Sequence, residues 1–103
     1  SYTGYIILGN IYNVNMKQDS AVFFYKLAEN KIKDKISHSL SNNNYLSDLI
    51  LIKTILNKKH AFNYLLDLKN KELIGDEVFK NYKLIIDSFD KNGYLNNYRS
   101  RFY

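Results

Sequence analysis

The stretch that decides the fold runs from Tyr5 to Ala28 and reads YIILGNIY (5–12), NVNMKQDS (13–20) and AVFFYKLA (21–28). Gly9 and Ala21 are small, so two antiparallel helices can approach closely where they cross. Apolar residues recur at steps of three and four, which places them on the inner stripes of two helices. These residues are Tyr5, Leu8, Tyr12, Tyr25 and Ala28. The polar segment between them predicts a turn, with Asp19 or Ser20 capping the second helix.

The same positions resemble the tetratricopeptide repeat, a helix–turn–helix unit of about 34 residues with a Trp-x2-Leu-Gly-x2-Tyr…Ala-x3-Phe pattern. The matching residues here are Tyr5, Leu8, Gly9, Tyr12, Ala21, Tyr25 and Ala28, and the later proline is replaced by Lys33. The alternative is an ordinary amphipathic hairpin that meets the pattern by chance. The resemblance implies a scaffold for protein–protein interaction, without catalysis or cofactor.

A weaker copy of the hairpin follows at residues 45–68, offset by 40 residues from the first. Tyr45 takes the place of the first aromatic residue and Ala61 that of the alanine, but Asp48 and Leu49 replace the Leu-Gly pair. A period of about 40 residues is closer to other paired-helix solenoids. The sequence therefore predicts two hairpins, the second one degenerate.

The apolar spacing predicts six helices, with approximate ranges 3–13, 20–40, 45–57, 60–70, 76–90 and 94–103. Residues 41–44 are expected to form a loop, Lys58-Lys59 a very short turn, and Asn92-Gly93 the end of the fifth helix. One buried face of that helix is expected to hold Val78, Phe79, Tyr82, Ile85, Ile86 and Phe89. The last helix is expected to cap the open end of a short solenoid.

We therefore predict an all-α fold, a short antiparallel helical-hairpin array with C-terminal capping helices, in one domain over residues 1–103. The chain begins with Ser1 rather than Met, so we expect a fragment of a longer protein. No apolar run approaches the roughly 18 residues of a membrane helix, and we expect no membrane partner. The absence of a signal peptide and of cysteine favours an intracellular location but does not establish it.

Peptide binding is the task that the resemblance implies, because the first helix of each tetratricopeptide unit lines a concave groove. The groove-facing positions would be Thr3, Ile6, Asn10, Asn13 and Val14. Asn10 matches an asparagine that some members use to hold a partner's carboxyl terminus, but Ile6 stands where a lysine is expected. An asparagine can still hold a peptide backbone, since its amide both donates and accepts. Alternatively, Asn10 and Asn13 are simply exposed. The partner would be another protein or peptide, or neighbouring repeats of the parent chain.

The net charge of +5 is concentrated in residues 31–60. Two clusters carry it, Lys31/Lys33/Lys35 and Lys53/Lys58/Lys59. With ten tyrosines for base stacking, they support an alternative function, a basic subunit of a ribonucleoprotein or other nucleic-acid complex. Only two arginines occur, and lysines often coat solvated faces, so we favour protein binding.

No other motif indicates chemistry. His38 and His60 have no suitably spaced ligand or nucleophile beside them, and the four glycines are isolated. A calcium loop around Gly93 would need carboxylates where Ser88 and Arg99 stand. We therefore predict no catalytic residue, no metal and no cofactor.

Overall fold

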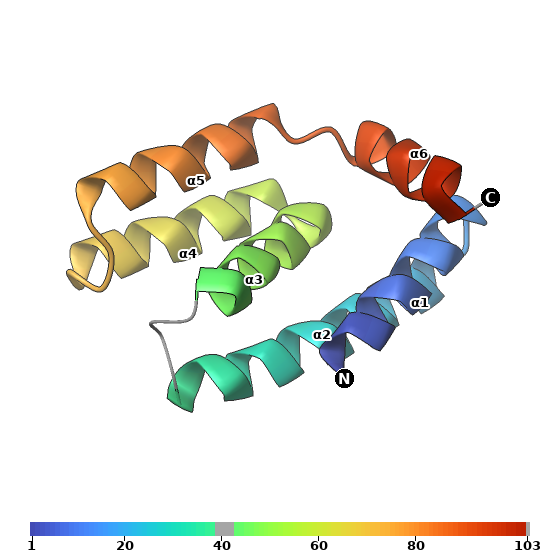
Figure 1. Cartoon of the computed structure of the whole chain (residues 1–103), viewed down its shortest axis with the longest axis horizontal. Helices are drawn as coiled ribbons and strands as arrows, with labels where there is room; N and C mark the ends of the chain where they lie inside the picture. Colours follow the sequence, from blue (N-terminus) through green and yellow to red (C-terminus); the bar gives the residue numbers. More distant parts are fainter. Residues whose placement is uncertain (39–42, 103) are drawn as a thin grey trace.

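The computed structural model describes the backbone of residues 1–38 and 43–102 and the side chains of residues 1–37 and 44–96. Six helices follow one another: α1 (Tyr2–Val14), α2 (Gln18–His38), α3 (Asn43–Leu56), α4 (Lys58–Asn70), α5 (Asp76–Ser88) and α6 (Lys91–Phe102). No strand occurs in the described ranges. The prediction of an all-α helical array is confirmed (Figure 1).

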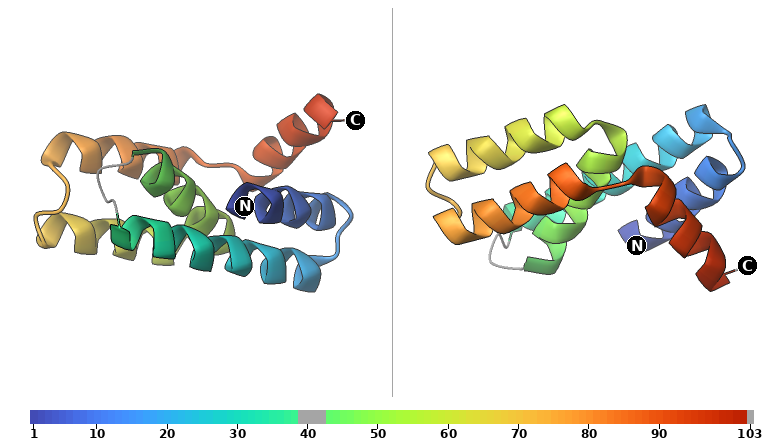
Figure 2. Two further views of the ribbon diagram at one scale, coloured as in Figure 1. Left: turned by 60° about the horizontal axis from the view of Figure 1, so that its bottom comes forward. Right: turned by 90° about the horizontal axis from the view of Figure 1, so that it is seen from above.

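Consecutive helices pack against one another along most of the chain. α1 and α2 form an antiparallel hairpin, α2 packs on α3, and α4 packs on both α3 and α5 (Figure 1). α6 departs from this order, because it returns across the molecule to α1 (Figure 2). The predicted capping helix thus covers part of the first helix, so that the first and last helices are in contact.

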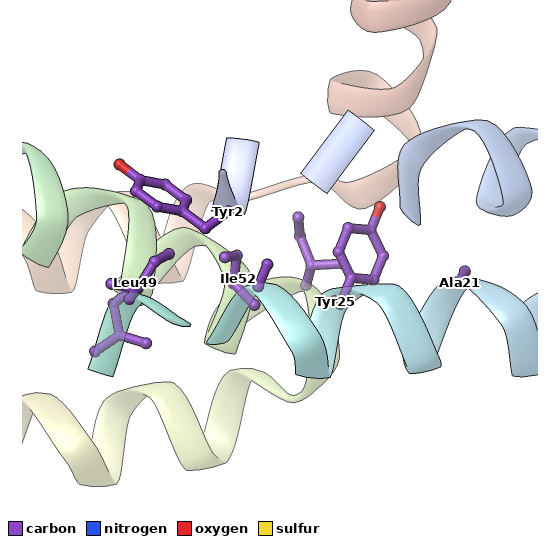
Figure 3. Packing of buried hydrophobic residues seen from close by; sticks show 8 residues of the cluster. Tyr2, Ala21, Tyr25, Leu49 and Ile52 are labelled. Carbon is purple, nitrogen blue, oxygen red and sulfur yellow. The ribbon is translucent and has the colours of Figure 1, made fainter. Parts of the chain in front are cut away.

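Helix α3 lies at the centre because it is apolar on more than one face, as expected of a helix buried on several sides. Leu49 and Ile52 belong to a core cluster shared with α1 and α2. Leu46 and Ile50 belong to a second cluster shared with α4 and α5. Figure 3 shows the first cluster, with Tyr25 of α2 beside the α3 side chains.

The two hairpins bury equivalent positions. Ala21, Tyr25 and Ala28 of α2 are at most 1% exposed. The residues 40 positions later, Ala61, Leu65 and Leu68 of α4, are at most 5% exposed. This agreement supports the weak internal repetition at the level of paired helices.

Local signals misplaced four helix starts. α2 begins at Gln18 and α6 begins at Lys91. Asp19 and Ser20 therefore lie inside α2, and the prediction that one of them caps it is wrong. α3 begins at Asn43, inside the predicted 41–44 loop, and residues 39–42 lie outside the described residues. α4 begins at Lys58, because the side chain of Asn57 caps it by accepting from the backbone N–H of His60 at 3.2 Å. The predicted turn at Lys58-Lys59 is therefore wrong, and the connection is shorter still.

The end of the fifth helix was also misplaced. α5 ends at Ser88, and Gly93 lies inside α6 without a positive φ, so it is not a helix C-cap. The carboxylate of Asp90 instead accepts from the backbone N–H of Asn92 at 3.0 Å, at the start of α6. The predicted face of α5 is only partly correct, because Val78 and Ile85 are 40% and 50% exposed.

Candidate interaction surfaces

Asn10 of α1, predicted to face a groove, is buried and bonded inside the chain. Its Oδ1 accepts from the hydroxyl of Tyr25, and its Nδ2 donates to the hydroxyl of Tyr94 at 3.2 Å. Asn10 is 1% exposed. The prediction that its amide holds a partner's backbone is replaced by an internal role, in which Asn10 ties α2 and α6 to α1.

Asn13, one turn further along α1, is also buried, but its amide is only half satisfied. Its Oδ1 accepts from Nε2 of Gln18 at 2.8 Å. Its Nδ2 is buried and has no hydrogen-bond partner among the described residues. A buried donor without a partner lowers the stability of the folded chain by about 1–3 kcal/mol.

Asn13 lies at a pocket between α1 and α6, which has a volume of about 350 Å³. Asn13 and Val14 line it from α1, and Asn92, Leu95 and Asn96 line it from α6. Two of the predicted groove residues therefore meet at one site, with three residues that the sequence analysis did not select. No local pattern could have indicated those three, because they reach the site only through the return of α6 to α1.

The other two predicted groove residues are separate from this pocket. Thr3 is exposed in the first turn of α1, where its backbone N–H donates to Oγ of Ser1 at 3.3 Å. Ile6 is partly buried and packs against the first core cluster. The predicted row is thus divided between solvent, core and pocket.

The outer surface of α1 is an uncharged apolar face. None of its residues from Tyr2 to Val14 carries a charge. Ile7 and Leu8 are 38% and 37% exposed. Leu8 was predicted to lie on an inner stripe, and it is instead half-buried at the edge of the hairpin.

The two predicted lysine clusters meet at one carboxylate. Glu29 of α2 accepts from Lys53 of α3 at 3.0 Å and lies 3.9 Å from Lys33. Lys31 and Lys35 lie over tyrosine rings, 5.8 Å from the centroid of Tyr5 and 5.7 Å from that of Tyr45. Four of the six lysines therefore have partners within the chain.

The remaining two lysines of these clusters, Lys58 and Lys59, are exposed in the first turn of α4. That turn contains no acidic residue, although the positive end of a helix dipole favours one. Beside it, a groove of about 410 Å³ is lined by Val22, Lys26 and Glu29 of α2, Lys53 and Leu56 of α3, and Asn57 and His60 at the start of α4.

At the other end of α1, burial raises the pKa of a tyrosine, Tyr2. The hydroxyl of Tyr2 donates to Oδ2 of Asp48 at 2.7 Å. Burial first, and then this bond and the charge of Asp48, raise the pKa of Tyr2 to about 12. The pair fastens the start of α1 to α3.

Within the described residues, no group of three acidic, histidine or cysteine side chains is placed to hold a metal ion. None of the helices searched in the same part of the chain is both long and apolar enough to cross a bilayer. His60 is exposed at the start of α4, and the side chain of His38 lies outside the described residues.

The chain was compared with protein-family models, with curated proteins and with solved structures, and none of the three comparisons found a match. The class of the protein is therefore defined by its own architecture, an all-α array of packed helices whose last helix closes on the first.

Proposed function

We propose that this chain is a non-catalytic protein-interaction module, a short helical-repeat scaffold of the tetratricopeptide type that takes up a segment of a partner protein. One observation carries the proposal. Asn13 lines the pocket between α1 and α6, and its buried Nδ2 has no hydrogen-bond partner among the described residues. A bound acceptor would satisfy this donor and recover its desolvation cost.

The chemistry of the pocket favours a peptide backbone as that acceptor. Asn13, Asn92 and Asn96 supply amides, and each amide both donates and accepts, as a peptide unit does. Val14 and Leu95 supply apolar surface for a neighbouring side chain. The described residues that line the pocket carry no charge, so a neutral stretch of backbone suits them better than a phosphate or a carboxylate.

A random-peptide display library, panned against the full chain, tests the proposal. Asn96 is exposed at the pocket, so Asn96→Leu removes an amide there without disturbing the core. We expect the selected peptides to bind this variant at least about tenfold more weakly, equivalent to 1.4 kcal/mol. Asn63→Leu, at an exposed position of α4, is the matched control and should leave binding unchanged.

Peptides that bind the Asn96→Leu variant as well as the original chain would contradict the pocket as the binding site. The alternative function, nucleic-acid binding, predicts a different pattern. A single-stranded RNA would bind through lysines, and its affinity would fall steeply as salt is raised, because counterions are released from the phosphates. Peptide binding in an uncharged pocket should depend little on salt.

A further inference from the structure

The groove between α2 and the α3–α4 junction is separate from the pocket between α1 and α6, because the two share no lining residue. Val22, Lys26 and Glu29 follow one another at steps of four and three along α2, so they present one face of that helix. Leu56 and Asn57 form the opposite wall, where α3 ends and α4 begins. The result is an apolar strip with charged edges.

The charge of this groove is unbalanced. Among the described residues that line it, one carries a carboxylate, Glu29, and this carboxylate forms an ion pair with Lys53. The side chain of Lys53 is only 13% exposed, and its Nζ also lies 4.7 Å from the ring centroid of Tyr64. Lys26 is exposed on α2 and has no ion pair among the described residues. Lys26 therefore leaves an uncompensated positive charge at the edge of the groove.

The start of α4 adds to the same field. Lys58 and Lys59 occupy the first turn, next to Asn57 of the groove wall. Two cations at the positive end of a helix dipole destabilise the helix. An arrangement that lowers stability in this way is more often found at functional sites than elsewhere.

We propose that this groove docks an acidic segment of a partner protein, with an apolar side chain of the segment seated on Val22 and Leu56 and its carboxylates facing Lys26, Lys58 and Lys59. Charge complementarity identifies the occupant, since Lys26 lines the groove and Lys58 and Lys59 adjoin its wall, all three without an ion pair among the described residues. The apolar strip distinguishes a peptide from a polyanion, because a phosphate backbone has nothing to place on Val22 and Leu56.

Fluorescence anisotropy with the full chain tests this inference. The probe is a short labelled peptide in which glutamates flank a leucine pair. We expect saturable binding, lost when serines replace the leucines. The double variant Lys58→Glu/Lys59→Glu should bind at least about tenfold more weakly, because repulsion replaces attraction. The same variant should unfold at higher urea, since glutamates suit the start of a helix. Weaker binding by a more stable protein cannot be attributed to unfolding.

The single variant Lys58→Glu should also bind more weakly, and Lys80→Glu is its matched control, because Lys80 is exposed on α5, which does not line the groove. It makes one identical charge reversal and should change binding less than about twofold. Equal weakening by the control would overturn the proposal, since attraction would then reflect net charge alone. An absence of peptide binding would also overturn it, as would an RNA that binds more tightly than the peptide. None of these results would contradict the proposal that the pocket between α1 and α6 binds a peptide, because that site is tested with different residues and with neutral peptides.

Discussion

Gly9 of α1 faces the ring of Tyr25 on α2 so closely that a Cβ at this position would lie 2.7 Å from two ring carbons. The Tyr25 ring cannot yield easily, because Tyr25 is 1% exposed and its hydroxyl donates to Asn10. The contact explains why a glycine stands in the middle of a helix, where it lowers helix propensity by about 1 kcal/mol relative to alanine. It also revises the pairing of Gly9 with Ala21 that the sequence suggested, because the glycine makes room for an aromatic ring.

Replacing Gly9 by alanine should therefore destabilise the protein. Overpacking against a buried ring costs about 1–3 kcal/mol, which exceeds the gain in helix propensity. The free energy of unfolding from urea titration measures the effect. Gly4→Ala in the same helix is the control, because a Cβ at Gly4 meets nothing within 4 Å. Gly4→Ala should be neutral or stabilise by up to about 1 kcal/mol. Two equal outcomes would mean that the Gly9–Tyr25 contact is not tight.

The hydrogen bond from Asn10 to Tyr94 joins residues 84 positions apart and fastens α6 to α1. Tyr94→Phe keeps the ring but leaves the buried Nδ2 of Asn10 without its acceptor, so we expect a loss of about 1–3 kcal/mol. Hydrogen exchange should show the amides of α6 losing protection before those of α3, because α6 has fewer neighbours.

Tyr12→Phe provides the control for this hydroxyl. The ring of Tyr12 stacks on Phe24 with centroids 5.4 Å apart, and phenylalanine preserves that stacking. Its hydroxyl makes no hydrogen bond to another described residue. The change should cost less than about 0.5 kcal/mol. Unaltered exchange of α6 in the Tyr94→Phe protein would show that other contacts hold the helix.

Tyr2 makes stability depend on alkaline pH. Its pKa is about 12 in the folded chain against an ordinary value of 10.0, so the neutral phenol is favoured by folding. Its contribution is complete below pH 10 and is lost as the pH rises through the folded pKa. The loss amounts to roughly 2–3 kcal/mol, at 1.36 kcal/mol per pKa unit.

Urea unfolding at about pH 9 and about pH 12 measures this dependence. Burial also raises the pKa values of Tyr64 and Tyr82, so these residues contribute a decline of the same sign. Tyr2→Phe isolates the contribution of Tyr2, because the variant cannot ionise there. The variant should start less stable, having lost the bond to Asp48, and should decline less steeply with pH. Parallel curves for the two proteins would refute the assignment.

Two turns hold a residue other than glycine in the left-handed conformation. Met16 has φ 62° after α1, and Glu72 has φ 59° after α4. Both turns close with the same bonds, Lys17 N–H to the carbonyl of Tyr12 and Leu73 N–H to that of Leu68, as in a Schellman motif.

Glycine adopts this conformation without the Cβ penalty, so Met16→Gly and Glu72→Gly should each raise the free energy of unfolding by about 0.5–1 kcal/mol. Thermal unfolding measures the gain. Lys71→Gly serves as the control, because Lys71 has φ −85° and gains nothing from glycine. If Lys71→Gly stabilises as much as Glu72→Gly does, the left-handed geometry is not the cause.

The helices and the two hairpins were predictable because their signals are local. Burial of Ala21, Tyr25 and Ala28 follows from a periodicity that any short window of the sequence displays. Helix starts were predicted less well. The side chain of Asn57 caps α4, so Lys58 and Lys59, which were predicted to form a connecting turn, lie in the first turn of the helix.

The faces of the outer helices were harder to predict, because an apolar residue is buried only if a neighbour covers it. Leu8, Val78 and Ile85 have the correct spacing for an inner stripe and are nevertheless 37–50% exposed. Periodicity specifies which side chains share a face of a helix. The arrangement of the neighbouring helices decides how wide a covered face becomes.

By itself, the sequence determined an array of six helices in which small residues mark the first crossing, since helix formation and pairing of adjacent helices depend on contacts close in the chain. Only the tertiary structure decided that α6 returns to α1 and that two lysine clusters meet at Glu29. It also decided that Asn10 is enclosed, while Nδ2 of Asn13 has no partner among the described residues. The bonds Asn10–Tyr25, Glu29–Lys53 and Asn10–Tyr94 join residues 15, 24 and 84 positions apart. No local pattern specifies these partners, so the bonds become defined only when the helices pack.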